Sequence, residues 1–106
     1  MTKTDQTKPG CMRYALSILG DKWTGLLVRE LCSGPKTFSE LEQLSGGISP
    51  RTLSQRLEKL QAEGIIETDE YCVKPRRCNY CLTSKGVELK GILDAMADWS
   101  AKHNCC

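Results

Sequence analysis

Apolar positions at helical spacing predict two helices in the first third of the chain. The first covers 11–19 and is followed by Gly20, which is typical of a helix end. The second is expected to be a buried helix of about three turns that Asp21 caps and Gly34-Pro35 ends. The apolar positions that carry this pattern are Met12, Leu16 and Leu19 in the first helix and Trp23, Leu26, Leu27 and Leu31 in the second.

Residues 37–64 have the pattern of two helices joined by a tight turn. The Thr-Phe-Ser-Glu sequence of 37–40 has capping-box spacing, so a third helix is expected to begin there and to end at Ser45-Gly46-Gly47. Ser49 then precedes Pro50, which is a favourable start for a fourth helix that runs to Gly64. The apolar positions are Leu41 and Leu44 in the third helix and Leu53, Leu57 and Leu60 in the fourth. Together they predict a helix-turn-helix.

A short β-hairpin and a last helix are expected after the fourth helix. Residues 65–68 and 71–73 indicate one strand, 74–77 a basic turn and 78–82 the returning strand. Thr83 or Ser84 can cap the last helix. Its apolar side chains surround too much of its circumference for one small domain to bury, which suggests a dimer interface. They are Val87, Leu89, Ile92, Leu93, Met96 and Trp99.

Size and composition fit one small domain. The chain has 106 residues, 40% of them hydrophobic and 26% charged, and no apolar run approaches the ~18 residues of a membrane span. We expect a flexible arm over 1–10, a mainly α winged helix-turn-helix domain (α+β) with a small β-hairpin wing over 11–103, and a tail over 104–106. The arm lacks the apolar stretch of a secretory signal, so a cytoplasmic protein with no membrane partner is expected.

The fourth helix carries candidate DNA-binding side chains on the face opposite its leucines. The net charge is only +2, so nucleic-acid binding would depend on local surfaces. Arg can pair bidentately with guanine and Gln with adenine, while hydroxyls can contact phosphates or bases. The predicted contact residues of this helix are Ser49, Arg51, Thr52, Ser54 and Gln55. An ordinary solvated helix face is the alternative.

The turn of the hairpin supplies a second candidate DNA-binding surface. Lys74, Arg76 and Arg77 follow one another without an intervening acid, and they would contact phosphates or the minor groove beside the site. The alternative is a solvated turn that neutralises the preceding acids, Glu67, Asp69 and Glu70.

Cys11 is the candidate reactive thiol. It stands at the N-terminal end of the first helix, where unpaired backbone amides and the helix dipole favour a thiolate, with Lys8 and Arg13 near it in sequence. A small buried hydrophobe is the alternative role of a reduced cysteine.

The other cysteines leave a metal site open, although none is predicted. The seven cysteines are odd in number and unevenly spaced, which disfavours a secreted disulfide framework. Cys78 and Cys81 are three residues apart, so on an extended strand they face opposite ways and chelate one ion poorly. His103 is the only histidine, and there is no phosphate-binding Gly loop, so neither an enzyme nor a cofactor is expected. The remaining candidate metal ligands are Cys72, Cys105 and Cys106.

In this order, the motifs resemble the HxlR-type branch of the MarR-like winged-helix regulators from Cys11 to about Trp99. The resemblance is carried by Cys11, Gly20-Asp21-Lys22-Trp23, Phe38-Ser39-Glu40-Leu41, the run from Gly47 to Leu53, Leu57, Leu60, Gly64-Ile65-Ile66, the run from Tyr80 to Gly86, and Trp99. It implies a homodimer formed through the terminal helices, a pseudo-palindromic double-stranded DNA operator, and control of transcription in either direction. It also implies that Cys11 senses oxidants or electrophiles, with the small-molecule effector unknown. Cys32 and the other extra cysteines are not part of the family pattern.

Two further functions fit the same elements. A metal-responsive winged-helix sensor would share the DNA surface and use several thiolates to hold an ion. A protein-interaction winged helix would bind no duplex even at low salt.

Overall fold

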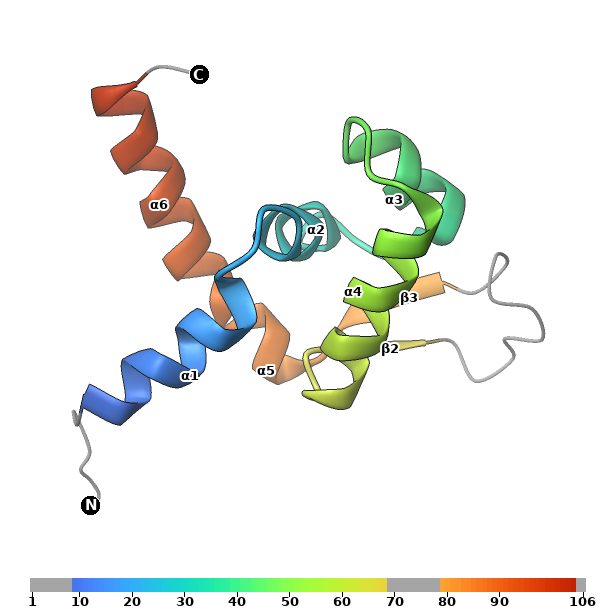
Figure 1. Ribbon diagram of the computed structural model, residues 1–106, viewed down its shortest axis with the longest axis horizontal. Coiled ribbons are helices and arrows are strands. Elements are labelled where there is room, and N and C mark those ends of the chain that lie inside the picture. The colour runs from blue at the N-terminus through green and yellow to red at the C-terminus, as the bar shows by residue number, and fades with distance from the viewer. Residues whose placement is uncertain (1–8, 69–78, 105–106) are drawn as a thin grey trace.

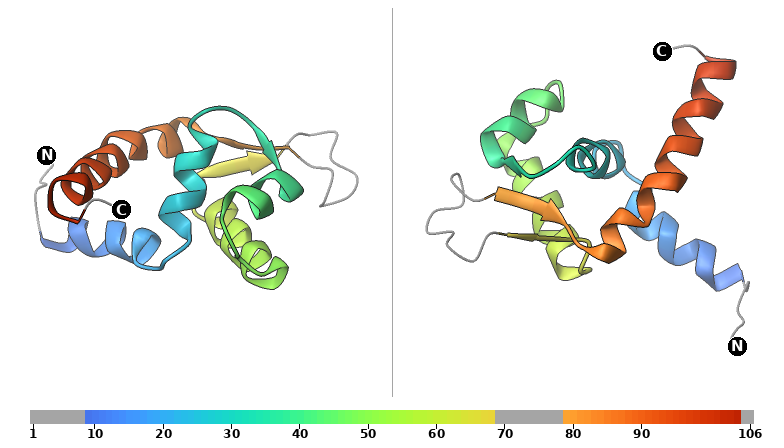
Figure 2. Two further views of the ribbon diagram at one scale, coloured as in Figure 1. Left: turned by 90° about the horizontal axis from the view of Figure 1, so that it is seen from above. Right: turned by 180° about the vertical axis from the view of Figure 1, so that it is seen from behind.

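The computed structural model describes residues 9–68 and 79–104 and has the predicted mainly α, winged-helix architecture. A small antiparallel sheet lies beside α4, and the terminal helices α1 and α6 extend on the side of the molecule away from α3 (Figures 1 and 2). The elements in chain order are α1 (Pro9–Leu19), α2 (Thr24–Leu31), β1 (Lys36–Thr37), α3 (Phe38–Leu44), α4 (Pro50–Ala62), β2 (Ile66–Thr68), β3 (Asn79–Leu82), α5 (Ser84–Val87) and α6 (Leu89–His103).

The first two helices differ from the prediction at their ends and on one face. Helix α1 begins at Pro9, so the predicted arm over 1–10 overlaps it by two residues. Helix α2 has eight residues, fewer than the three turns expected. Leu26 was expected on its buried face but is half exposed, whereas Val28 is fully buried. Leu27 and Leu31 are buried as predicted, and Trp23 is partly buried against the core. Thr24 is a further fully buried residue in the first turn that the pattern did not predict.

The helix-turn-helix follows the predicted signals closely. Thr37 Oγ1 accepts a hydrogen bond from the Glu40 amide, and Glu40 Oε1 accepts one from the Thr37 amide, so the capping box is present. The turn into α4 contains Gly46 and Gly47 with φ of 67° and 111°, a backbone region that disfavours other residues. Leu44 was expected to be buried but is half exposed, because it lies in the last turn of α3 beside this turn.

The sheet contains a strand that the sequence pattern did not predict. Its order is β1-β3-β2, and all pairs are antiparallel. The hairpin strands were expected, but β1 consists of only two residues, Lys36 and Thr37, which pair with Tyr80 and Asn79. Because Thr37 also caps α3, this short strand attaches the start of the helix-turn-helix to the wing. The predicted strand residues 71–73 and Cys78 lie outside the described residues.

The predicted last helix is two helices. Thr83 caps α5 by accepting a hydrogen bond from the Gly86 amide, and its own hydroxyl donates to the Gly64 carbonyl at 2.6 Å. Gly86 is buried against the Ile65 carbonyl, which leaves no room for a Cβ. Contact with the sheet therefore holds α5 in place, while α6 starts at Leu89 and extends away (Figure 1).

One hydrophobic core connects these elements, and the terminal helices leave apolar side chains outside it. Leu27, Leu41, Leu53 and Leu60 are fully buried at its centre. Met12, Leu16, Ile92, Met96 and Trp99 are between 48% and 66% exposed in this single chain. The surplus apolar surface expected on the last helix is thus present, and α1 adds to it.

Candidate nucleic-acid interface

Helix α4 separates a buried face from an open one. Leu53, Leu57 and Leu60 are at most 2% exposed and anchor the helix in the core. Arg51, Ser54 and Gln55 are exposed on the other side and form no hydrogen bond or ion pair with any residue in 9–68 or 79–104. The three predicted base-contacting side chains are therefore brought together on one surface and are available to a ligand.

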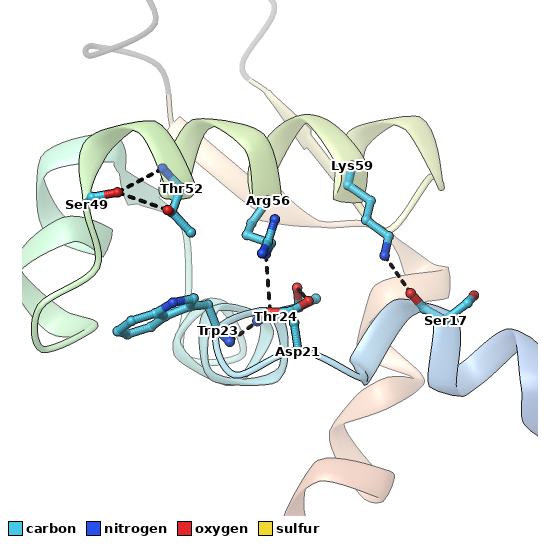
Figure 3. Close-up of polar contacts among 8 residues, drawn as sticks. All are labelled: Ser17, Asp21, Trp23, Thr24, Ser49, Thr52, Arg56 and Lys59. Carbon is cyan, nitrogen blue, oxygen red and sulfur yellow. Dashed lines mark hydrogen bonds and ion pairs between the residues drawn. The ribbon is translucent and has the colours of Figure 1, made fainter.

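Two other predicted contact residues take part in the N-terminal cap of α4. Ser49 Oγ accepts a hydrogen bond from the Thr52 amide at 3.1 Å and donates one to Thr52 Oγ1 at 2.9 Å (Figure 3). The Ser49 hydroxyl proton is thus used within the protein. The cap also fixes where the first amides of α4 point, and exposed helix N-termini suit phosphate oxygens.

Asp21 anchors the middle of α4 to the start of α2. Its Oδ1 accepts hydrogen bonds from the Trp23 and Thr24 amides at 2.8 Å and lies 3.3 Å from Arg56 Nε (Figure 3). Partial burial acts to raise the pKa of Asp21, but the hydrogen bonds from Thr24 and Trp23 and the charge of Arg56 outweigh it, so the pKa is lowered. The sequence predicted Asp21 as the cap of α2, and its carboxylate does accept a hydrogen bond from the Thr24 amide at the first helical residue, although the N-cap position itself is Trp23 and no side chain caps from there. The ion pair with Arg56 was not predicted.

A second set of contacts ties the C-terminal end of α4 to α1. Lys59 Nζ donates to the Ser17 carbonyl at 2.5 Å (Figure 3). Tyr14 Oη donates to Glu63 Oε1 at 2.9 Å, and Lys85 Nζ donates to Tyr14 Oη at 2.7 Å and to the Glu63 carbonyl at 2.6 Å. We call Tyr14, Glu63 and Lys85 the α1–α4 clasp. No sequence pattern predicts the clasp, because its members are far apart in the chain and each has an ordinary surface residue type.

The wing surface is only partly described. Strands β2 and β3 are paired from Ile66↔Leu82 to Thr68↔Tyr80, and the chain between them carries Lys74, Arg76 and Arg77. These three predicted contact residues lie outside the described residues.

The cysteines form no candidate metal site in the described part of the chain. Cys11 lies in the first turn of α1, and its side chain is outside the description; Cys72, Cys78, Cys105 and Cys106 are outside it altogether. Cys32 and Cys81 are both half buried. No three Cys, His, Asp or Glu side chains within 9–68 and 79–104 are grouped as metal ligands. His103 instead lies against the Trp99 ring, with a centroid distance of 4.9 Å.

Comparison with known proteins assigns this arrangement to a family. The pattern of the HxlR-like helix-turn-helix family matches residues 18–105. The chain belongs to this family. YvaP, an uncharacterised HTH-type transcriptional regulator of Bacillus subtilis, is 37% identical over 94 residues, 87% of either chain. The B. subtilis regulator YodB is 35% identical over 89 residues, 84% of this chain and 80% of YodB.

Solved structures of such regulators have the same fold. The reduced form of YodB matches with a TM-score of 0.77 and 32% identity, covering 93% of this chain and 96% of that one. The reduced form of the redox regulator HypR matches with a TM-score of 0.79 and 30% identity, covering 87% of this chain and 91% of HypR. The chain is therefore a transcriptional regulator of the helix-turn-helix type and not an enzyme. In the part of the chain that the structure describes, no helix combines the length and apolar character needed to cross a membrane.

Proposed function

We propose that this protein is a sequence-specific regulator of transcription that binds double-stranded DNA as a homodimer. The observation that carries the proposal is the open face of α4, where Arg51, Ser54 and Gln55 are exposed beside a capped helix N-terminus. The N-terminal residues of such a recognition helix contact base edges in the major groove. Lys74, Arg76 and Arg77 would add phosphate contacts from the wing.

The apolar faces of α1 and α6 support the dimer. Met12 and Trp99 are each about two-thirds exposed in the single chain. Monomeric proteins rarely expose such apolar patches to water, and larger patches mark interaction surfaces. A twofold contact through these helices would leave both α4 helices free for the two half-sites of an operator. Such a regulator acts where the chromosome is, which places it in the cytoplasm.

We further propose that oxidation or alkylation of Cys11 controls DNA binding. Two relatives support a thiol-linked response: HypR has been solved in reduced and oxidised forms, and YodB in reduced and quinone-bound forms. In this chain, Cys11 stands one turn before Tyr14, so a change at Cys11 would reach α4 through the α1–α4 clasp. The clasp would thus connect α1, which carries the proposed sensor Cys11, to the C-terminal end of α4.

A titration with DNA tests the first proposal. Binding sites are selected from a pool of random duplexes, and the affinity of the reduced protein for the selected site is measured at increasing salt. We expect a pseudo-palindromic site and an affinity that falls steeply with salt, because each neutralised phosphate releases counterions. If no duplex is selected and none is bound at low salt, the chain is a protein-interaction winged helix instead.

The Cys11 proposal needs a separate comparison. Wild type, Cys11→Ser and, as a control, Cys81→Ser are titrated with the selected site before and after mild oxidation. We expect oxidation to change the affinity of wild type and of Cys81→Ser, and to leave Cys11→Ser unaffected. A Cys11→Ser protein that responds as wild type does would refute the role of Cys11 without affecting the DNA-binding proposal.

A further inference from the structure

A small pocket away from α4 brings together two cysteines that lie outside the family pattern. It has a volume of about 220 Å³ and lies between the end of α2, strand β3 and the junction of α5 and α6. Most of its wall is apolar, and Lys90 is the only charged side chain among the described residues that line it. Its lining includes Leu31, Cys32, Cys81, Leu82, Val87 and Lys90.

The two thiols are held differently. Cys81 Sγ lies 3.8 Å from the Glu67 carbonyl oxygen and 4.0 Å from Glu67 Oε2, so its thiol has acceptors on the neighbouring strand and a carboxylate close by. Cys32 is the C-cap residue of α2, where its backbone amide is bonded to α2 carbonyls, and its sulfur lies within electrostatic range of the Lys90 ammonium. Cys81 thus has a carboxylate close to its sulfur, whereas Cys32 has the Lys90 ammonium near it, so an addition that develops negative charge is better placed at Cys32.

Cys32 and Lys90 also line a second, adjoining cavity that opens between α2 and α6. Cys32 can therefore be reached from solvent although it is half buried. Lys90 Nζ is fixed at this entrance by a 2.8 Å ion pair with Asp94. The hydrogen bond and charge of Asp94 raise the pKa of Lys90, and Cys32 adds in the same direction, so Lys90 keeps its positive charge at neutral pH.

We propose that this pocket takes up a small, neutral α,β-unsaturated carbonyl compound, which adds covalently to Cys32. The wall favours an apolar ligand, and the volume lies below the ~300–1,000 Å³ of sites for drug-sized ligands, so the compound has one ring or a short chain. The site is distinct from Cys11, and the proposal does not depend on DNA binding.

The conjugate addition of the Cys32 thiol to such a compound needs no oxidant. The Cys32 thiol gives its proton to solvent, and the sulfur forms a bond to the β-carbon of the compound. The π bond between the α- and β-carbons breaks, and its electron pair passes to the carbonyl oxygen as an enolate. The Lys90 ammonium lies on the same pocket wall and stabilises that negative charge. A solvent proton on the α-carbon then gives the saturated thioether.

Site-resolved alkylation by cyclohexenone tests the proposal. The reduced full-length protein is treated with this compound, and the rate of adduct formation at each cysteine is measured by mass spectrometry of peptides, in buffer and in urea. If the pocket promotes the reaction, Cys32 should react roughly tenfold faster in the folded protein than in the unfolded chain, because binding positions the carbon beside the sulfur. Cys81 should react more slowly in the folded protein.

Matched variants separate the pocket from ordinary thiol reactivity. Val87→Trp, which fills the pocket, and Lys90→Gln, which removes the charge, should each lower the folded-state rate at Cys32 at least threefold while leaving the rate in urea unchanged. Iodoacetamide, a small neutral reagent that alkylates by displacement and forms no enolate, should show no loss of rate at Cys32 in Lys90→Gln. A Cys32 that reacts more slowly with cyclohexenone in folded than in unfolded protein, or that keeps its rate in both variants, would overturn the proposal.

Discussion

At the residue scale, Asp21 connects α4 to the start of α2 through both hydrogen bonds and an ion pair. Its carboxylate accepts hydrogen bonds from two backbone amides and from the Thr24 hydroxyl at the start of α2, and it forms an ion pair with Arg56 of α4. The orientation of α4, the proposed recognition helix, therefore depends on a residue outside its open face. Asp21 was predictable as a cap because capping signals are local. Its partner Arg56 was not, because it lies 35 positions further along the chain and only the fold brings the two together.

Replacing Asp21 should lower stability in a pH-dependent way. We expect Asp21→Ala to reduce the free energy of unfolding by about 1–2 kcal/mol at neutral pH, as for the loss of a helix cap. The folded-state pKa of Asp21 is lowered, so its contribution is present above its unfolded pKa of about 3.9 and is lost as the pH falls through the folded value. The gap between wild type and variant in urea unfolding should thus close in acid.

Glu58→Ala is the control for Asp21→Ala, because Glu58 is exposed on α4 and no described residue forms an ion pair or hydrogen bond with it. Its stability should stay within about 0.5 kcal/mol of wild type at either pH. If Asp21→Ala lowers the free energy of unfolding by the same amount at neutral and acidic pH, the charge of the carboxylate contributes nothing to stability.

At the scale of elements, local signals predicted the starts of α3, α4 and α5, while long-range contacts set what the sequence pattern missed. Thr37, Ser49 and Thr83 all cap as expected. The two-residue β1 has too little length for any periodicity, and it exists because β3 offers it a partner. The apolar run from Val87 to Trp99 looked like part of one helix, since nothing near Gly86 in sequence reveals its contact with the Ile65 carbonyl.

The contact at Gly86 predicts opposite effects of one substitution at two glycines. A Cβ at Gly86 would overlap the Ile65 carbonyl, so Gly86→Ala should destabilise the protein by about 1–3 kcal/mol. Gly91 lies in α6 with open space where a Cβ would be, so Gly91→Ala should stabilise it by about 0.4–1 kcal/mol. Thermal unfolding of both variants checks this, and equal effects at the two sites would contradict the proposed packing of α5.

The α1–α4 clasp predicts a variant that folds but whose DNA affinity changes little on oxidation. Tyr14→Phe removes the hydroxyl that joins Glu63 to Lys85, and we expect a loss of about 0.5–1.5 kcal/mol in stability. If the clasp transmits the state of Cys11, the ratio of DNA affinities between reduced and oxidised protein should also shrink. Ser17→Ala is the matched control, because the Ser17 hydroxyl bonds only within α1 among the described residues. An unchanged affinity ratio in Tyr14→Phe would exclude this route.

At the scale of the whole molecule, α4 and the exposed apolar faces of α1 and α6 lie at different ends. The molecule measures 41 × 36 × 22 Å, with α1 and α6 together on one side and α3 and α4 on the other (Figure 1). This separation would allow two copies to associate through the terminal helices without covering either α4.

The proposed dimer predicts a shift in molecular mass. Trp99 is 64% exposed at the end of the apolar face of α6, so Trp99→Glu should place a charge in the contact and shift the protein toward monomer in analytical ultracentrifugation. Gln43→Glu, an added charge on exposed α3, should leave the mass unchanged. Wild type that sediments as a monomer at micromolar concentration would contradict the dimer.

The proposed contact between the open face of α4 and the bases is tested by measuring how this face affects sequence discrimination. The measurement is the affinity of Arg51→Ala/Gln55→Ala for its selected site and for random duplex DNA, with Gln61→Ala as an exposed control in the last turn of the same helix. We predict that the double variant loses about 2–6 kcal/mol of preference for the selected site while retaining salt-dependent binding to random DNA. Undiminished preference in the double variant would show that this face of α4 does not contact the bases.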